Sequence, residues 1–263
     1  MSRYRFALRP AWIVSHLFVL LLIVTMINLG FWQLRRLDQR KEFNATVREH
    51  AAAEPVTGSQ LVRASDGAND VAAVEWRRVT VRGAYRRDDV LVANRALDGE
   101  PGYWIVTPLV TVDSGTVAVV RGFVTRALVT TGPVPGTAAS SEPVEVTGFV
   151  RVPGTSARFA TDTANGELTQ TNKVDVRALG QRWGVTLAPY WVQLSEQQPP
   201  QQGDALRPVP RPKLDNGPHL SYAIQWFIFS AIGIVGYPLI LRRNAHGRSR
   251  EAAKPDGASE AVR

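Results

Sequence analysis

The chain has 263 residues, 44% of them hydrophobic, which is enough for one ordinary globular domain plus membrane segments. It contains no cysteine, so disulfides, zinc fingers, c-type haem attachment and thiol-based copper transfer are excluded. The net charge is +8, yet 18 basic and 19 acidic residues lie between Glu42 and Asp215. The positive excess therefore flanks two hydrophobic segments, where it suits lipid headgroups, and a nucleic-acid partner is excluded.

The first predicted element is a membrane-spanning helix. Residues 12–31 (WIVSHLFVLLLIVTMINLGF) carry no charge except a possible one on His16. At about 1.5 Å per residue they would extend roughly 30 Å, one hydrocarbon thickness. The run is longer than the core of a signal peptide, and no small-x-small cleavage site follows it. We therefore predict a cytoplasmic N-terminus over residues 1–11 and an uncleaved transmembrane helix over residues 12–33.

The central region, residues 34–215, is predicted to be rich in β-structure. Its short valine-rich and aromatic-rich runs, separated by Gly, Pro and Asp, are typical of an antiparallel sheet or barrel. The predicted strands cover 75–85, 89–96, 102–112, 115–124, 143–152 and 188–195. One short helix is predicted over 173–184, because its apolar residues recur at helical spacing and Gly184 suits a helix end. Residues 130–143 and 196–212 are predicted loops.

A second transmembrane helix is predicted over residues 216–241, since residues 220–241 contain no charge. The basic residues that follow favour a cytoplasmic location for the tail, residues 242–263, which we predict to be disordered. The predicted fold is thus an α+β membrane protein. Two transmembrane helices flank an extracytoplasmic, barrel-like antiparallel β-domain with one short helix. The protein is expected to be a multi-pass protein of the cell membrane, in contact with the lipid bilayer.

Catalytic signatures are missing from the sequence. None of the four histidines lies in an HxxxH or HExxH spacing, and there is no phosphate-binding loop or nucleophile elbow. Asp88 and Asp89 are adjacent, so on a strand they point to opposite faces, and they suit a turn. We therefore expect no catalytic residue and no enzymatic activity.

His219 is the candidate ligand residue. On a helix it shares a face with Tyr222 and Trp226, and an antiparallel first span brings Trp32 and Gln33 to the same level. A neutral imidazole in an aromatic, half-apolar site suits a haem iron as axial ligand. From these residues alone the commoner alternative is an interfacial histidine that touches headgroups and water. His16, at the opposite membrane face, is assigned no role.

Four collinear stretches together resemble the Surfeit locus protein 1 family, from the first predicted span to the second. They are LGFWQLRRLDQRK (29–41), VTVRGAY with VLVANRALDGEPGYWIVTPL (79–109), VAVVRGFV (117–124) and DNGPHLSYAIQWF (215–227). The last stretch departs from the family pattern, in which Asn directly precedes His, by Gly217-Pro218 between Asn216 and His219. Proline suits a first helical turn, so Pro218 is expected to sharpen the helix start at His219.

The resemblance implies a bacterial assembly factor of the respiratory chain, a chaperone that receives haem a and assists its insertion into core subunit I of cytochrome c oxidase. It implies His219 as the metal ligand, and the shared helix face described above leads us to expect Tyr222, Trp226, Trp32 and Gln33 around the cofactor. Gly30 belongs to the outer end of the first span, and Gly102-Tyr103 forms a structural turn and strand start.

An alternative is an accessory or scaffold subunit that stays bound to the oxidase, or to a respiratory supercomplex, without holding haem. A haem-modifying monooxygenase is disfavoured, because that chemistry requires several ligating histidines on many more spans. The Arg, Ala, Val and Gly content points to a GC-rich bacterium.

Overall fold

The computed structural model describes residues 5–64, 70–129, 134–153, 162–164 and 167–251. The chain divides into two compact units. The helical unit comprises Met1–Asn44 and Leu214–Arg263, and the β unit comprises Ala45–Lys213.

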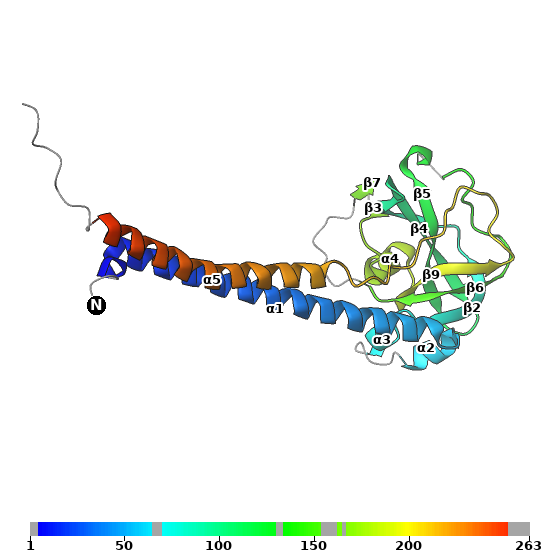
Figure 1. Ribbon diagram of the computed structural model, residues 1–263. Helices are drawn as coiled ribbons and strands as arrows, with labels where there is room; N and C mark the ends of the chain where they lie inside the picture. The colour runs from blue at the N-terminus through cyan, green and yellow to red at the C-terminus, as the bar shows by residue number, and fades with distance from the viewer. Residues whose placement is uncertain (1–4, 65–69, 130–133, 154–161, 165–166, 252–263) are drawn as a thin grey trace, which may run out of the picture. The chain divides into compact units, whose positions relative to one another are not determined.

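Two long helices form the helical unit (Figure 1). After a short 3-10 turn, η1 (Arg5–Leu8), helix α1 covers Pro10–Ala52, and α5 covers His219–Glu251. Both helices are long and apolar enough to cross a membrane, and most of their large apolar side chains are exposed. The predicted pair of apolar helices flanking a β-domain is therefore confirmed.

The helices extend further than the sequence indicates. Helix α1 continues beyond residue 33 to Ala52, and α5 continues through residue 251. Residues 242–251, expected to be disordered, are thus helical. They contain no proline, and their single glycine costs a helix only about 1 kcal/mol. The rest of the predicted tail, residues 252–263, lies outside the described residues.

Small residues line the seam between α1 and α5. A Cβ placed on Gly30 would lie 2.6 Å from the Phe227 ring, and one on Gly233 would lie 3.1 Å from Cγ1 of Ile23. Ala223 is also buried. Such residues let helix backbones approach closely in apolar surroundings. Gly30 therefore permits close approach of α1 and α5.

The far end of the same seam carries a polar cluster. Nδ1 of His16 lies 2.7 Å from the Tyr237 hydroxyl, which lies 3.0 Å from Oγ of Ser15. Nε2 of His16 lies 3.1 Å from the carbonyl oxygen of Ala7, which can only accept, so Nε2 carries a proton. His16, which has no role predicted from the sequence, therefore links the two helices.

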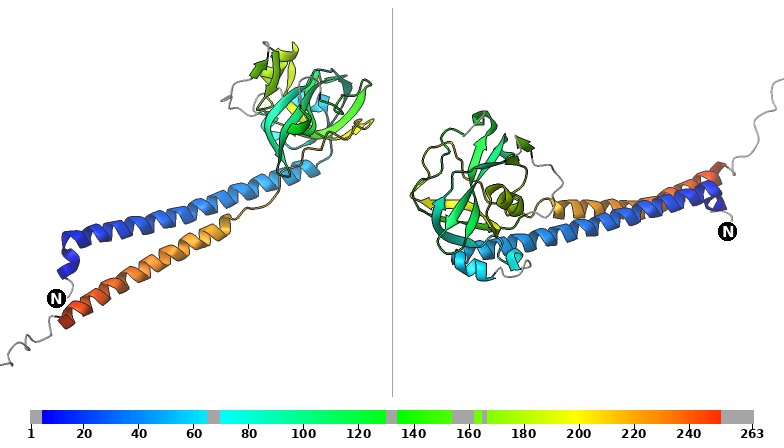
Figure 2. Two further views of the ribbon diagram at one scale, coloured as in Figure 1. Left: turned by 90° about the horizontal axis from the view of Figure 1, so that it is seen from above. Right: turned by 180° about the vertical axis from the view of Figure 1, so that it is seen from behind.

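The β unit is a closed barrel with additional strands (Figures 1 and 2). In the described residues the strand order is β1-β2-β6-β9-β5-β4-β3-β8-β7, and an extra β2–β4 pairing closes the ring β2-β6-β9-β5-β4. The strands are β1 (Val56–Thr57), β2 (Arg78–Tyr85), β3 (Val90–Leu97), β4 (Glu100–Thr111), β5 (Thr116–Thr125), β6 (Val144–Arg151), β7 (Asp162–Ala164), β8 (Glu167–Thr171) and β9 (Leu187–Gln198). The helical elements of this unit are α2 (Gly58–Ala64), α3 (Asp70–Ala73), η2 (Arg126–Leu128) and α4 (Val176–Trp183).

The barrel-like domain and its short helix are confirmed, with one difference in strand direction. The sheet is mixed, because β1–β2, β3–β8 and β5–β9 pair in parallel. The parallel β5–β9 pair arises because the long connection between β6 and β9, which includes α4, returns the chain to the barrel beside β5. Alternating hydrophobicity indicates that a segment is a strand, but it does not indicate which strand pairs with it or in which direction.

Two hydrophobic clusters explain the valine-rich strands. Alternate residues of the five ring strands, such as Val117 and Val119, fill the barrel interior. Their neighbours Ala118 and Val120 join a second cluster with Leu179 of α4. Strand β5 is therefore buried on both faces, which is why its sequence is almost continuously apolar.

Helix α4 lies within the predicted segment 173–184 and ends before Gly184 as expected, but it begins only at Val176, after an Asp175 cap that was not predicted. The Asp175 side chain accepts hydrogen bonds from the backbone N–H groups of Arg177 and Ala178. Gly184 follows the helix with φ of 63°, the left-handed conformation that glycine adopts without strain.

Candidate functional site

A tight turn immediately precedes α5. Oδ1 of Asp215 accepts a hydrogen bond from the backbone N–H of Gly217 at 3.0 Å, and Gly217 has φ of +62°. The Pro218 carbonyl accepts the first helical bond, from the N–H of Tyr222 at 3.2 Å. The helix accordingly begins at His219, as the position of Pro218 predicts.

Asn44 ties this turn to α1. Its side chain is fully buried, and Nδ2 donates to the carbonyl oxygen of Asp215 at 2.9 Å and to Oδ1 of Asn216 at 3.2 Å. Asn44 therefore holds the segment that immediately precedes His219. The sequence does not reveal this role, because the predicted first helix ends at residue 33.

The imidazole of His219 is oriented by Gln33. Nδ1 of His219 lies 2.9 Å from Oε1 of Gln33, and since an amide oxygen only accepts, the Nδ1–H group donates. In the neutral ring this leaves the lone pair on Nε2, the arrangement found in histidines that bind metals. A Cβ on Gly217 would lie 3.3 Å from Cδ2 and 3.4 Å from Nε2, so the glycine keeps space beside Nε2. Gln33 thus lies at the level of His219, as expected, and the two helices are in contact there.

A cavity of about 390 Å³ adjoins His219. One stripe of α1 lines it with Arg36, Gln39, Arg40 and Phe43, and the turn before α5 completes it with Asp215, Gly217 and His219. The arginines and Gly217 are not among the site residues predicted from the sequence. The signal was present, since residues 33, 36, 40 and 44 share a helix face once α1 is continued past residue 33.

The aromatic residues expected around the site are partly exposed. Tyr222 and Trp32 are each about half exposed, and Trp226 packs edge-on against Phe229 with ring centroids 6.2 Å apart. Among the described side chains, none of these three has a hydrogen bond or ring contact with His219. Of the five predicted residues, the structure therefore brings His219 and Gln33 together.

The other histidines are placed differently. His16 uses both ring nitrogens in the polar cluster at the far end of the helical unit. Nδ1 of His50 lies 2.6 Å from the Glu75 carbonyl oxygen, and Nδ1 of His246 lies 2.8 Å from that of Arg242. Of the four, it is His219 that lines the cavity described above.

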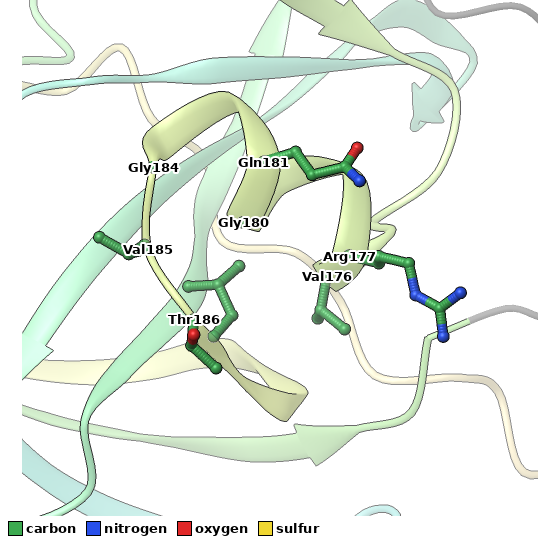
Figure 3. A pocket seen from close by; sticks show the side chains of 8 residues that line it. Val176, Arg177, Gly180, Gln181, Gly184, Val185 and Thr186 are labelled. Atoms are coloured by element: carbon green, nitrogen blue, oxygen red, sulfur yellow. The ribbon is translucent and has the colours of Figure 1, made fainter.

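A second hollow, of about 560 Å³, lies between α4 and the chain that leaves it (Figure 3). It is lined by α4 and by residues 184–187, while the Arg177 side chain extends away from Val185 and Thr186. The hollow is lined mainly by apolar groups and glycines, which offer no acid, base or metal ligand.

Among the described residues of the β unit, Arg121 is a buried cation with several hydrogen-bond partners. The Arg121 side chain is 1% exposed and donates to Oγ1 of Thr107 at 2.7 Å, to the Thr137 carbonyl at 2.6 Å and to Oδ2 of Asp89 at 3.1 Å. Burial raises the pKa of nearby Tyr85, an effect opposed by the positive charge of Arg121. This arrangement is structural.

The acidic pair is also structural. Asp88 bonds to Arg86 and Arg182, whereas Asp89 bonds to Arg121, so the two carboxylates have different partners. Gly102 and Tyr103 lie near the start of β4, and a Cβ on Gly102 would lie 2.1 Å from the Val124 carbonyl oxygen. Glycine at this position is required by the close approach of β5.

Comparison with known proteins places this arrangement in a family. Residues 20–231 match the model of the SURF1 family. An uncharacterized SURF1-like protein of Mycobacterium bovis is 29% identical over 96% of this chain and 92% of its own length. SURF1-like proteins of Rickettsia felis and Monosiga brevicollis are 25% and 28% identical, each over 88% of this chain and over 97% and 89% of their own lengths. With the match running from the first apolar helix into the second, the chain belongs to the SURF1 family.

Proposed function

We propose that the protein is a membrane-embedded assembly factor for haem–copper cytochrome c oxidase, which binds haem a through His219 and assists its insertion into core subunit I. Both apolar helices cross the cell membrane, the termini are cytoplasmic and the β unit is extracytoplasmic. Membership of the SURF1 family supports the assembly role, and the length and apolar character of α1 and α5 support the membrane location. The protein acts as a carrier and not as an enzyme.

The observation that carries the haem proposal is the hydrogen bond from Nδ1 of His219 to Oε1 of Gln33. It leaves Nε2 free to ligate and fixes the plane of the ring. The space beside Gly217 keeps Nε2 accessible, and a single imidazole suffices because a haem supplies the equatorial ligands of its own iron. When bound, the haem iron supplies an exchangeable ligand position, so that transfer needs only replacement of the imidazole.

The surrounding residues fit an apolar, planar group. Tyr222, Trp226 and Trp32 stand at the flanks of the helix pair with partly exposed rings, which offer an aromatic surface to a macrocycle that enters from the lipid. Gln33 holds the ligand ring, and Asn44 holds the turn before it. These residues bind and orient the haem, and none of them needs to transfer a proton.

The test is an optical spectrum of the full-length protein, purified in detergent from a host that makes haem A. His219→Ala is compared with His246→Ala, which removes a histidine of the same helix with a backbone-bonded ring. We expect a haem a spectrum for the unaltered protein and for His246→Ala, and its loss or displacement for His219→Ala. Gln33→Leu should keep the haem with a shifted band, because the ring loses its orienting acceptor.

Equal haem content in His219→Ala and the unaltered protein would refute His219 as the ligand. Absence of haem from all forms, together with oxidase assembly that still depends on the protein, would favour a scaffold subunit that stays with the oxidase. Retention of the protein in purified oxidase measures that alternative directly.

A further inference from the structure

Two arginines line the cavity beside His219 without an acidic partner. Nη1 of Arg36 donates to Oε1 of Gln39 at 3.3 Å, and the Arg40 guanidinium lies 5.7 Å from the centroid of the Phe43 ring. Among the described residues, neither arginine forms an ion pair with a carboxylate. The one acidic residue of the lining, Asp215, already accepts a bond from Gly217. The cavity therefore has an excess of positive charge.

The two arginines lie at increasing distances along α1 from Gln33, the residue that bonds the ligand histidine. Gln33, which bonds His219, precedes Arg36 by about one turn of α1 and Arg40 by about two turns, or roughly 5 and 11 Å along the helix axis. The three residues share one face of α1, and the cavity that Arg36 and Arg40 line also reaches the imidazole. The ring of Phe43 holds the Arg40 group by a cation–π contact, which reduces the side-chain freedom lost on binding.

We infer that Arg36 and Arg40 bind the carboxylates of the tetrapyrrole whose iron His219 ligates, an inference that rests on the proposed function. Guanidinium groups match carboxylates in charge and in planar geometry, and a haem carries its two carboxylates on one edge. The carboxylate edge then lies in the cavity, and the apolar edge faces the exposed apolar side chains of α1 and α5. The arginines thereby determine the orientation of the bound cofactor.

The experiment is a titration of the full-length protein in detergent with two probes, ferric haem B and its dimethyl ester, which lacks the carboxylate charges. The Arg36→Gln/Arg40→Gln variant is compared with the unaltered protein and with Arg35→Gln, which removes the neighbouring exposed charge outside the cavity. We expect the double variant to bind haem B roughly tenfold to a hundredfold more weakly, since hydrogen bonds between charged groups are strong.

The same double variant should bind the diester as the unaltered protein does, and its Soret band should keep its position, because the iron ligand is unchanged. Arg35→Gln should change neither affinity, and Arg36→Lys/Arg40→Lys should restore part of the affinity for haem B. An equal loss for both probes would overturn the inference, since the arginines would then only shape the cavity.

The outcomes separate this inference from the proposed function. If His219→Ala displaces the Soret band while the double arginine variant binds haem B at full affinity, the ligand assignment stands and the carboxylate contact is refuted. If the unaltered protein binds neither probe and also carries no haem a when it is purified from a host that makes haem A, both proposals are refuted.

Discussion

Replacement of Arg121 by methionine tests how the barrel depends on its buried cation. The side chain is 1% exposed, and its ion-pair partner Asp89 is 34% exposed. Breaking a buried ion pair by removing one partner costs about 3–5 kcal/mol of the free energy of unfolding. Water can partly hydrate Asp89, so we expect the lower end, about 3 kcal/mol. For a domain of this size that lowers the melting temperature by roughly 6–12 °C.

The assay is thermal and denaturant unfolding of the full-length protein in detergent, followed by near-ultraviolet circular dichroism and tryptophan fluorescence. Arg82→Met is the control, because Arg82 pairs with Glu145 at the surface and exposed pairs contribute about 0–1 kcal/mol. Adding Asp89→Asn to Arg121→Met should recover part of the loss, since it removes the uncompensated carboxylate. A cost for Arg121→Met no larger than that for Arg82→Met would mean that the barrel does not depend on its buried ion pair.

Further substitutions have defined outcomes. Tyr190→Phe should stabilise the β unit by about 1 kcal/mol, because the buried hydroxyl lacks a hydrogen-bond partner among the described residues. Tyr85→Phe should instead destabilise the β unit by about 1 kcal/mol, because the hydrogen bond from Tyr85 to Gln197 is lost. Burial raises the pKa of Tyr190 to about 12 from its ordinary value of 10, so the folded state holds this proton more tightly and stability should fall as pH rises from 10 to 12. Urea titrations across that range should show a smaller fall for Tyr190→Phe, and an unchanged fall would contradict the assignment. Gly30→Ala should weaken the α1–α5 pairing by about 1–3 kcal/mol in detergent unfolding, because its Cβ would overlap the Phe227 ring, and Phe227→Leu should relieve the loss. Asn44→Ala should weaken haem B binding without shifting the Soret band, since it frees the turn before His219 and leaves the ligand in place; an unchanged affinity would exclude Asn44 as a positioning residue.

Most of the fold could be predicted because its signals are local. Each of the six predicted strands overlaps an observed one, and α4 ends at the expected Gly184 although it begins three residues later than predicted. The strands β1, β7 and β8 were not predicted, because they are short and carry no alternating apolar pattern. Parallel pairing of β5 with β9 depends on contacts distant in sequence, which periodicity does not report.

The candidate site was predictable in part for the same reason. His219 and Gln33 stand out because polar residues at the ends of apolar helices need partners. Arg36, Arg40 and Asn44 look like ordinary surface residues of a region after the first span. Their shared face emerges only when α1 is known to continue to Ala52. The part of a helix that continues past the apolar segment has no hydrophobic pattern, so the end of α1 could be located only in the structure.

The polar cluster of His16 and Tyr237 has a mechanical consequence for the opposite end of the helix pair. His219 and Tyr237 are separated by about five turns of α5, roughly 27 Å, and so lie on the same side of that helix. Each forms a hydrogen bond to α1, one to Gln33 and the other to His16. Sliding α5 by one residue would also rotate it by about 100°, and both bonds would break together. The two bonds therefore constrain α5 against α1 at two separated points, and the contact of Tyr237 helps to keep the His219 imidazole in register with Gln33.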